Sequence, residues 1–336
     1  MTTDTAADSR TAASAVDGRS PRGVRRIYVA NLVAQAAIVV TGAVVRLSGS
    51  GLGCPTWPRC TEGSFVPVEG QVEAWHTYVE FGNRLLTFVL GLLAIAALVA
   101  AWSDARRRRA TGLAPRGALS ALAVVPIVGT LAQAVLGGIT VLTGLNPLIV
   151  GAHLLVSFGI VALVTLLVKR AGEPGDEPLI VVVRPEIRWG VRALAVIMAA
   201  TIVAGTLVTA SGPHAGDERT PRLGLDPQAL SWLHADLVLL SIGLLIGLLV
   251  ALRSTGAPVE VGHAAMVTLL LFFGQGAVGY VQYFTGLPWV LVAVHVLGST
   301  VVWWSTVRLL LMTRTRGVAY QGSSGSIATT RKSSAR

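Results

Sequence analysis

The stretch QAVLGGITVLTGLNPLIVGAHLLVS, residues 133–157, is matched by QGAVGYVQYFTGLPWVLVAVHVLGS at residues 275–299 without a gap. Both copies begin with Gln and turn at Thr-Gly-Leu. Each carries one His in its second apolar segment, His153 and His295. Self-similarity over such a long period is typical of an architecture built from two like halves. The repeat therefore predicts two similar helical hairpins, each with a His at the same place.

The composition indicates a membrane protein. Hydrophobic residues make up 53% of the 336 residues and charged residues 13%, and the mean hydropathy is +0.66. These values exclude an ordinary soluble domain and are typical of a polytopic membrane protein. The net charge of +10 does not indicate a nucleic-acid partner, because the cations lie in short blocks between apolar runs. We therefore expect membrane lipid around the chain and no nucleic acid.

Eight apolar runs have the length of a bilayer-spanning helix, about 20 residues. They lie at 25–46, 76–102, 118–142, 147–168, 189–210, 231–252, 262–284 and 288–312. A second, weaker repeat relates the first run to the fifth, since Gly42, Val45, Ser48 and Gly49 match Gly205, Val208, Ser211 and Gly212. The sequence predicts an all-α protein whose eight transmembrane helices form two pseudo-symmetric four-helix bundles.

The predicted organisation has five parts. They are a disordered cytoplasmic tail at 1–24, an N-terminal four-helix half at 25–170, a cytoplasmic linker at 171–188, a C-terminal four-helix half at 189–312 and a second disordered cytoplasmic tail at 313–336.

The distribution of cations predicts the orientation. Of the 27 Lys and Arg residues, 22 fall on one side of the predicted spans. The other side has only Arg46, Arg59, Arg84, Arg219 and Arg222. The positive-inside rule then places both termini in the cytoplasm. We expect a multi-pass protein of the cell membrane.

The two cysteines, Cys54 and Cys60, both lie in the predicted outer loop 47–75. A close pair outside the cytoplasm indicates a disulfide bond, and no other Cys or His lies beside them to form a zinc site. Two interpretations of the loop stay open. It is either a stapled surface loop, or a redox-active or lid-forming element over a membrane site.

Polar residues share one face at the start of the second predicted helix. His76, Glu80 and Asn83 are spaced four and three residues apart, and Arg84 follows Glu80 by four. A carboxylate at membrane level is unfavourable unless it faces the protein interior and has a partner. Arg84 is a candidate partner for Glu80.

Four histidines occupy equivalent levels, because His76, His153, His234 and His295 each lie near the outer end of an inward-running helix. Two imidazoles from facing helices suit the axial positions of a haem iron. The natural pairs are His234 with His295, and His153 with His76 or a neighbour. Zinc favours further Cys or carboxylate ligands, for which the second half offers only Asp236. Glycines that would leave room for a flat macrocycle are Gly129, Gly137, Gly138, Gly274, Gly276 and Gly279.

The loop text RLSGSGLGCP at 46–55 and the helix text EFGNRL at 80–85 resemble the heme A synthase family. So does the single His in each of the fourth, sixth and eighth helices. The resemblance covers about residues 25–312 and is to the bacterial single-chain, actinobacterial-like form. It implies a membrane oxidoreductase that oxidises a ring methyl of heme O to the formyl group of heme A, with haem b as an electron relay. It also implies heme O synthase, the cytochrome oxidase assembly pathway and an electron donor, a quinol or another, as partners.

The resemblance also implies roles for individual residues. His234 and His295 resemble the iron ligands of haem b, His153 resembles a ligand of the substrate haem, Glu80 resembles the catalytic glutamate, and Cys54 and Cys60 resemble an outer-loop disulfide. Many members have His where this chain has Asn83, and Asn is a poor haem-iron ligand. Either His76, two turns earlier, substitutes, or His153 holds the iron alone.

Two other functions fit parts of the pattern. A bis-His membrane cytochrome b passes electrons without modifying haem. A proton-coupled transporter uses repeats with intramembrane Glu and His as a relay.

Overall fold

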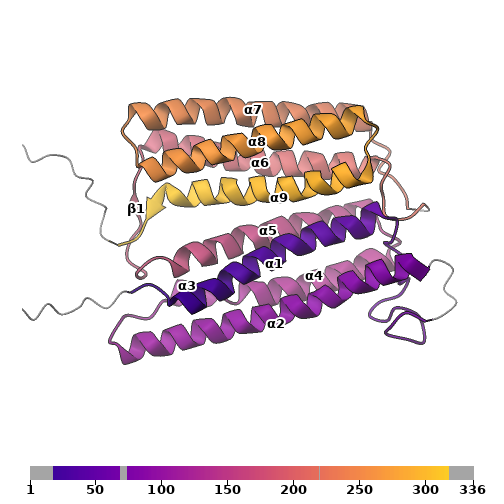
Figure 1. Cartoon of the computed structure of the whole chain (residues 1–336), viewed down its shortest axis with the longest axis horizontal. Coiled ribbons are helices and arrows are strands. Elements are labelled where there is room, and N and C mark those ends of the chain that lie inside the picture. Colours follow the sequence, from indigo (N-terminus) through magenta and orange to yellow (C-terminus); the bar gives the residue numbers. More distant parts are fainter. Residues whose placement is uncertain (1–17, 69–73, 219, 318–336) are drawn as a thin grey trace, which may run out of the picture.

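The computed structural model describes residues 18–68, 74–218 and 220–317 (Figure 1). Within them the chain forms nine helices: α1 (Arg22–Leu47), α2 (Ala74–Ala110), α3 (Gly117–Leu122), α4 (Val125–Leu142), α5 (Pro147–Ala171), α6 (Pro185–Ser211), α7 (Pro227–Ser254), α8 (Val259–Phe284) and α9 (Trp289–Met312). Eight candidate membrane spans result, with α3 and α4 together making the third. The predicted all-α fold with eight spans is confirmed.

The third span is interrupted at residues 123–124. Pro126 stands in the first turn of α4, and proline has no backbone N–H to continue the ladder of the preceding turn. The N–H of Val124 accordingly donates to the carbonyl of Ala121 at 3.2 Å, which is a tighter turn than an α-helix makes. The break separates the short α3 from α4, which carries the first copy of the repeat.

The predicted tails lie mainly outside the described residues, as 1–17 and 318–336. The helix α1 begins at Arg22, three residues before the predicted run. Part of the predicted second tail has regular structure, because β2 (Arg314–Thr315) pairs antiparallel with β1 (Ile180–Val181) of the linker. The end of α9 is thereby tied to the linker.

The helices pack side by side in two groups (Figure 1). The first contains α1, α2, α4 and α5, and the second contains α6, α7, α8 and α9. The groups meet where α9 contacts α1 and α5, and where α5 contacts α6. The symmetry of the two groups as whole bundles stays a prediction, whereas the two repeated hairpins can be compared residue by residue.

The two Thr-Gly-Leu turns adopt the same backbone geometry. Gly144 and Gly286 have φ of 61° and 77°, and the following Leu145 and Leu287 have φ of 59° and 58°. Positive φ is uncommon for a leucine. The N–H of each leucine reaches back to a carbonyl five residues earlier, at 2.9 and 2.8 Å, and so closes the preceding helix. The repeat in the sequence is therefore a repeat in local structure.

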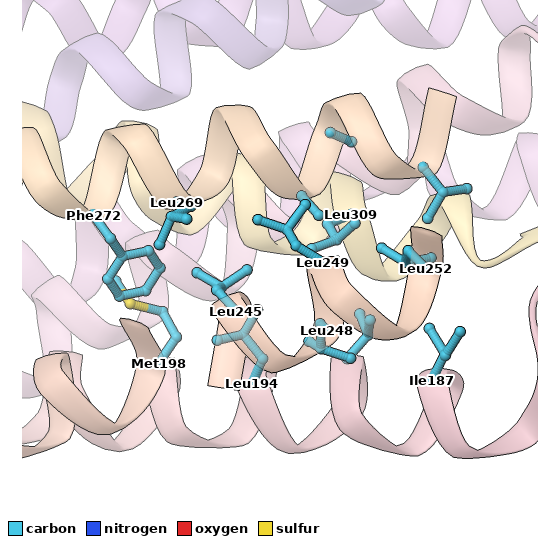
Figure 2. Close-up of a cluster of buried hydrophobic side chains, with 14 of the residues drawn as sticks. Ile187, Leu194, Met198, Leu245, Leu248, Leu249, Leu252, Leu269, Phe272 and Leu309 are labelled. Atoms are coloured by element: carbon cyan, nitrogen blue, oxygen red, sulfur yellow. The ribbon is translucent and has the colours of Figure 1, made fainter. Parts of the chain in front are cut away.

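The buried apolar core lies away from these turns. We call the end of the helices that carries residues 143–146 and 285–288 the turn end, and the end that carries 172–184 and 255–258 the linker end. The main core cluster comes from the middle and linker-end turns of α6 to α9, and its members include Leu194, Leu245, Leu249, Leu252, Phe272 and Leu309 (Figure 2). By contrast, no residue from 273 to 299 is buried. In α8 and α9, protein side chains thus fill the linker end more completely than the turn end, where His295 lies.

We expect Leu245→Ala to destabilise the protein by about 2–5 kcal/mol, because it removes a large side chain from a close-packed core. Leu245 is fully buried, whereas Leu240, on the same helix, is 55% exposed. Leu240→Ala is therefore the matched control and should be nearly neutral. The measurement is thermal unfolding of the purified protein in detergent. Equal losses in both variants would contradict the placement of the core.

Candidate functional site

Two imidazoles from facing helices meet in the C-terminal half. The ring centroids of His234, on α7, and His295, on α9, are 6.2 Å apart, with the ring planes at 60°. The Nδ1 atom of His234 lies 2.9 Å from the carbonyl oxygen of Thr201. Since a carbonyl only accepts, Nδ1 must be the protonated nitrogen. In the neutral ring the other nitrogen, Nε2, then keeps its lone pair, which is the state of an imidazole that binds a metal.

The spacing of this pair fits one metal ion between the rings. Imidazole nitrogens bind metals at about 2 Å, so two rings on opposite sides of one ion have centroids about 6 Å apart. Among the described residues, no three His, Cys, Asp or Glu side chains gather in a way that would hold a bare ion, and Asp236 is exposed. A haem iron needs only two protein ligands, because the porphyrin supplies the others. The residues present therefore fit a haem.

Each of three histidines lies against a glycine of the neighbouring helix. A Cβ atom added to Gly205 would come within 3.0 Å of the imidazole of His234. The same test gives 3.2 Å from Gly279 to His295 and 3.3 Å from Gly137 to His153. Any side chain at these positions would press on the ring, so the glycines create room for the imidazoles.

This result corrects the expectation that the glycines as a group make room for a macrocycle. Gly129 instead admits the side chain of Ile160, and Gly138 admits the indole of Trp57. Of the six glycines in that expectation, Gly274 and Gly276 have open space where a Cβ atom would stand.

In each copy of the repeat, a glutamine side chain donates a hydrogen bond to the backbone carbonyl of the histidine. The side-chain N–H of Gln133, on α4, donates to the carbonyl oxygen of His153 at 2.9 Å. Gln275, on α8, donates to His295 at 2.7 Å in the same way. The Nδ1 atoms of His153 and His295 are both buried without a hydrogen-bond partner. The glutamines were visible in the sequence as the first letter of the repeat, but their partner was not, because a backbone carbonyl leaves no mark in a sequence.

Glu80 is buried, and both of its carboxylate oxygens accept hydrogen bonds. Its side chain accepts hydrogen bonds from Arg84 Nε at 3.1 Å and Nη2 at 2.5 Å, and from the backbone N–H of Cys54 at 2.7 Å. Glu80 is only 5% exposed. The candidate ion pair with Arg84 is confirmed. A buried carboxylate with a cation and a backbone donor is held in one position.

The cysteine loop folds around Arg84. Cys54 and Cys60 form the expected disulfide bond. Arg84 donates to the carbonyl oxygens of Cys54, Thr56 and Arg59 at 2.8, 3.0 and 3.1 Å. One guanidinium thus joins the loop to the glutamate that it also neutralises.

The same loop reaches the helix beside His153. The indole of Trp57 packs on Gly138 of α4, and Gly137, its neighbour in sequence, contacts the imidazole of His153. Of the two interpretations of the loop, this contact favours a cover over the N-terminal half.

His76 lies under this loop and not deep in the bundle. Its Nδ1 atom is 2.9 Å from the hydroxyl of Ser50, and its ring stacks against Trp75 with centroids 4.0 Å apart. Asn83 follows seven residues later, which is about two helical turns toward the linker end. Its side-chain oxygen is buried and has no hydrogen-bond partner.

The comparisons with known proteins agree on one family. The family model for cytochrome oxidase assembly protein, COX15-CtaA, matches residues 25–307. A protein of Shouchella clausii named heme A synthase is 26% identical over 271 residues, which cover 77% of this chain and 86% of the relative. Proteins of the same name from Bacillus licheniformis and Geobacillus kaustophilus are 30% and 33% identical over 154 and 152 residues. Those two matches cover 45% and 44% of this chain and 47% and 44% of the relatives.

We expect Arg84→Gln to loosen the cysteine loop, because it leaves the Glu80 carboxylate buried without a cation, a change of about 3–5 kcal/mol. Trypsin should then cleave after Arg59 faster than in the unmodified protein, as read on a reducing gel. Arg253→Gln, at an exposed position of α7, is the control and should leave the rate unchanged. An unchanged rate in the Arg84 variant would show that the loop does not depend on this guanidinium.

Proposed function

The chain belongs to the COX15-CtaA family of cytochrome oxidase assembly proteins, and we propose that it is a heme A synthase. Its substrate is then heme O, and its product is heme A, in which a ring methyl group has become a formyl group. The relatives that carry this name support the proposal. The observation that carries it is the pair His234 and His295 with ring centroids 6.2 Å apart.

In the C-terminal half, we assign His234 and His295 as the ligands of haem b. The carbonyl of Thr201 fixes the ring of His234, and Gly205 and Gly279 let the two imidazoles approach the neighbouring helices. When bound, haem b supplies one-electron redox chemistry. The protein contributes the two ligands, their orientation and an apolar surrounding.

In the N-terminal half, we assign His153 as a ligand of the substrate haem. His153 repeats the surroundings of His295, with a glycine beside the ring and a glutamine on the carbonyl. We assign Glu80 as the catalytic residue. Its carboxylate is held in place by Arg84 and Cys54, so that it can stabilise positive charge that develops at the reacting methyl carbon, or accept a proton from it.

Oxidation of a methyl group to a formyl group with an oxygen atom from water releases electrons and protons. The proposal therefore requires an electron acceptor in place of the electron donor that the resemblance implies, and an oxidised membrane quinone is of the chemical class that can take these electrons. Heme O synthase is the expected source of the substrate.

We further propose that the chain lies in the cell membrane with both termini in the cytoplasm. The linker end carries the arginine-rich segments, as the positive-inside rule requires of the cytoplasmic face. The turn end, which carries the disulfide bond, then faces the oxidising side, where disulfide bonds persist.

The competing function is that of a bis-His cytochrome b, which uses the same ring geometry but leaves added haem unchanged. The buried ion pair of Glu80, on a separate helix from His234 and His295, favours the synthase, because electron transfer through a bis-His haem has no need of a carboxylate.

The test is co-expression of the full chain with a source of heme O, followed by extraction and identification of the haems. We expect heme A together with haem b. Haem b with unconverted heme O would favour the cytochrome, and a protein without haem would exclude both functions.

We expect Glu80→Gln to abolish heme A formation, because a neutral amide neither stabilises positive charge nor accepts the proton. The absorption spectrum of haem b should persist in this variant. Glu260→Gln, at an exposed position of α8, is the control and should form heme A normally. If the Glu80 variant loses the haem b spectrum as well, Glu80 is a structural residue and its catalytic assignment is wrong.

A further inference from the structure

The N-terminal half contains two candidates for the residue that faces His153, and both lie on α2. His76 has the right chemistry for an iron ligand, and Asn83 does not. The sequence leaves the choice open, because α2 has no clear match to α7. The packing of α1 against α2 decides it, since α1 does have a match, α6, in the second half.

The two helices pack antiparallel with a constant register. In such a pair the residue numbers of contacting positions add to a fixed value. One contact lies within both helices, Asn31 Nδ2 to the carbonyl of Leu93 at 2.8 Å, and its residue numbers add to 124. Two more come from residues that flank α1. Ser20 Oγ to Asp104 Oδ2 at 2.9 Å gives 124, and a Cβ atom added to Gly49, 3.6 Å from His76 Cε1, gives 125. The register does not slip between the linker end and the turn end.

This register places Asn83 opposite Gly42. Gly42, on α1, comes seven residues before Gly49, which lies just beyond the end of α1, and Asn83 comes seven residues after His76 on α2. Seven residues are close to two full turns, so each step stays on the same helical face. The pair Gly42 and Asn83 also lies between the Asn31–Leu93 contact and the Gly49–His76 contact. Its position is therefore interpolated between two contacts of the structure.

In the second half, the match of Gly42 is Gly205, and Gly205 lies against His234. Asn83 therefore occupies the place of His234, and His76 lies two turns away from it. The space agrees with this assignment, because a Cβ atom at Gly42 would meet no atom within 4 Å, whereas one at Gly205 would meet the imidazole at 3.0 Å. An asparagine is shorter than a histidine and leaves that gap.

The partner of this position follows from the hairpin repeat. His295 faces His234, and His153 is the counterpart of His295, with the same glycine and glutamine contacts. His153 therefore faces Asn83. The buried side-chain oxygen of Asn83 has no hydrogen-bond partner, and a buried polar group of this kind calls for one.

We propose that His153 is the sole protein ligand of the N-terminal haem iron and that the carboxamide of Asn83 faces the opposite side of the iron as a hydrogen-bonding group. His76 instead holds the loop through Ser50. This inference rests on the proposed haem-binding function. It makes the two halves chemically different, because the C-terminal iron has two histidine ligands and the N-terminal iron has one position open to a small ligand.

The test uses carbon monoxide and the full-length protein loaded with both haems. After reduction, we expect carbon monoxide to bind one of the two haems, and electron paramagnetic resonance of the oxidised protein to show one high-spin and one low-spin iron. Asn83→His should make both irons low-spin and abolish carbon monoxide binding, because it restores a second imidazole.

His76→Ala is the matched variant, and it should leave carbon monoxide binding and the spin states unchanged. A changed spin state in the His76 variant, or an unmodified protein with two haems of which neither binds carbon monoxide, would overturn this inference but leave the proposed function standing. A protein that binds no haem would overturn both. If Asn83→His fails to fold, the unmodified protein and the His76 variant still decide the question.

Discussion

Each of three imidazoles inside the helix bundle has a glycine directly across from it on the neighbouring helix. A Cβ atom on Gly137, Gly205 or Gly279 would lie 3.3, 3.0 or 3.2 Å from the ring of His153, His234 or His295, which is a tight contact. In a membrane protein, glycines at helix contacts usually serve close packing of backbones. Here they leave room for three imidazoles beside the neighbouring helices, and two of these rings form the His234–His295 pair.

In α8 and α9, the turn end, where His295 lies, is less filled by protein side chains than the linker end. The apolar core occupies the middle and linker end of α6 to α9, and no residue from 273 to 299 is buried. Close packing at one end fixes the helices, and the other end presents histidines, glutamines and glycines. Stability and the candidate site are thereby separated along the helix axes, in keeping with the rule that sites are precise when they stand on rigid elements.

Glu80 is held by a separate set of contacts in the N-terminal half. Its carboxylate is held by Arg84 and by the backbone of Cys54, and Arg84 in turn holds the disulfide loop. The loop places Trp57 on Gly138, next to the glycine that contacts His153. The glutamate, the loop and the first histidine are therefore linked through short contacts.

The sequence by itself determined the eight spans, the repeated hairpins, the disulfide bond and the Glu80–Arg84 pair. All of these depend on local periodicity, on spacing along one helix or on self-similarity. Such signals can be recognised in the amino-acid sequence. Which side chain faces which across two helices is set by register, and register depends on packing between segments far apart in the chain. Only the tertiary structure could therefore supply the contacts between α1 and α2 from which we infer that Asn83, and not His76, stands at the level of Gly42.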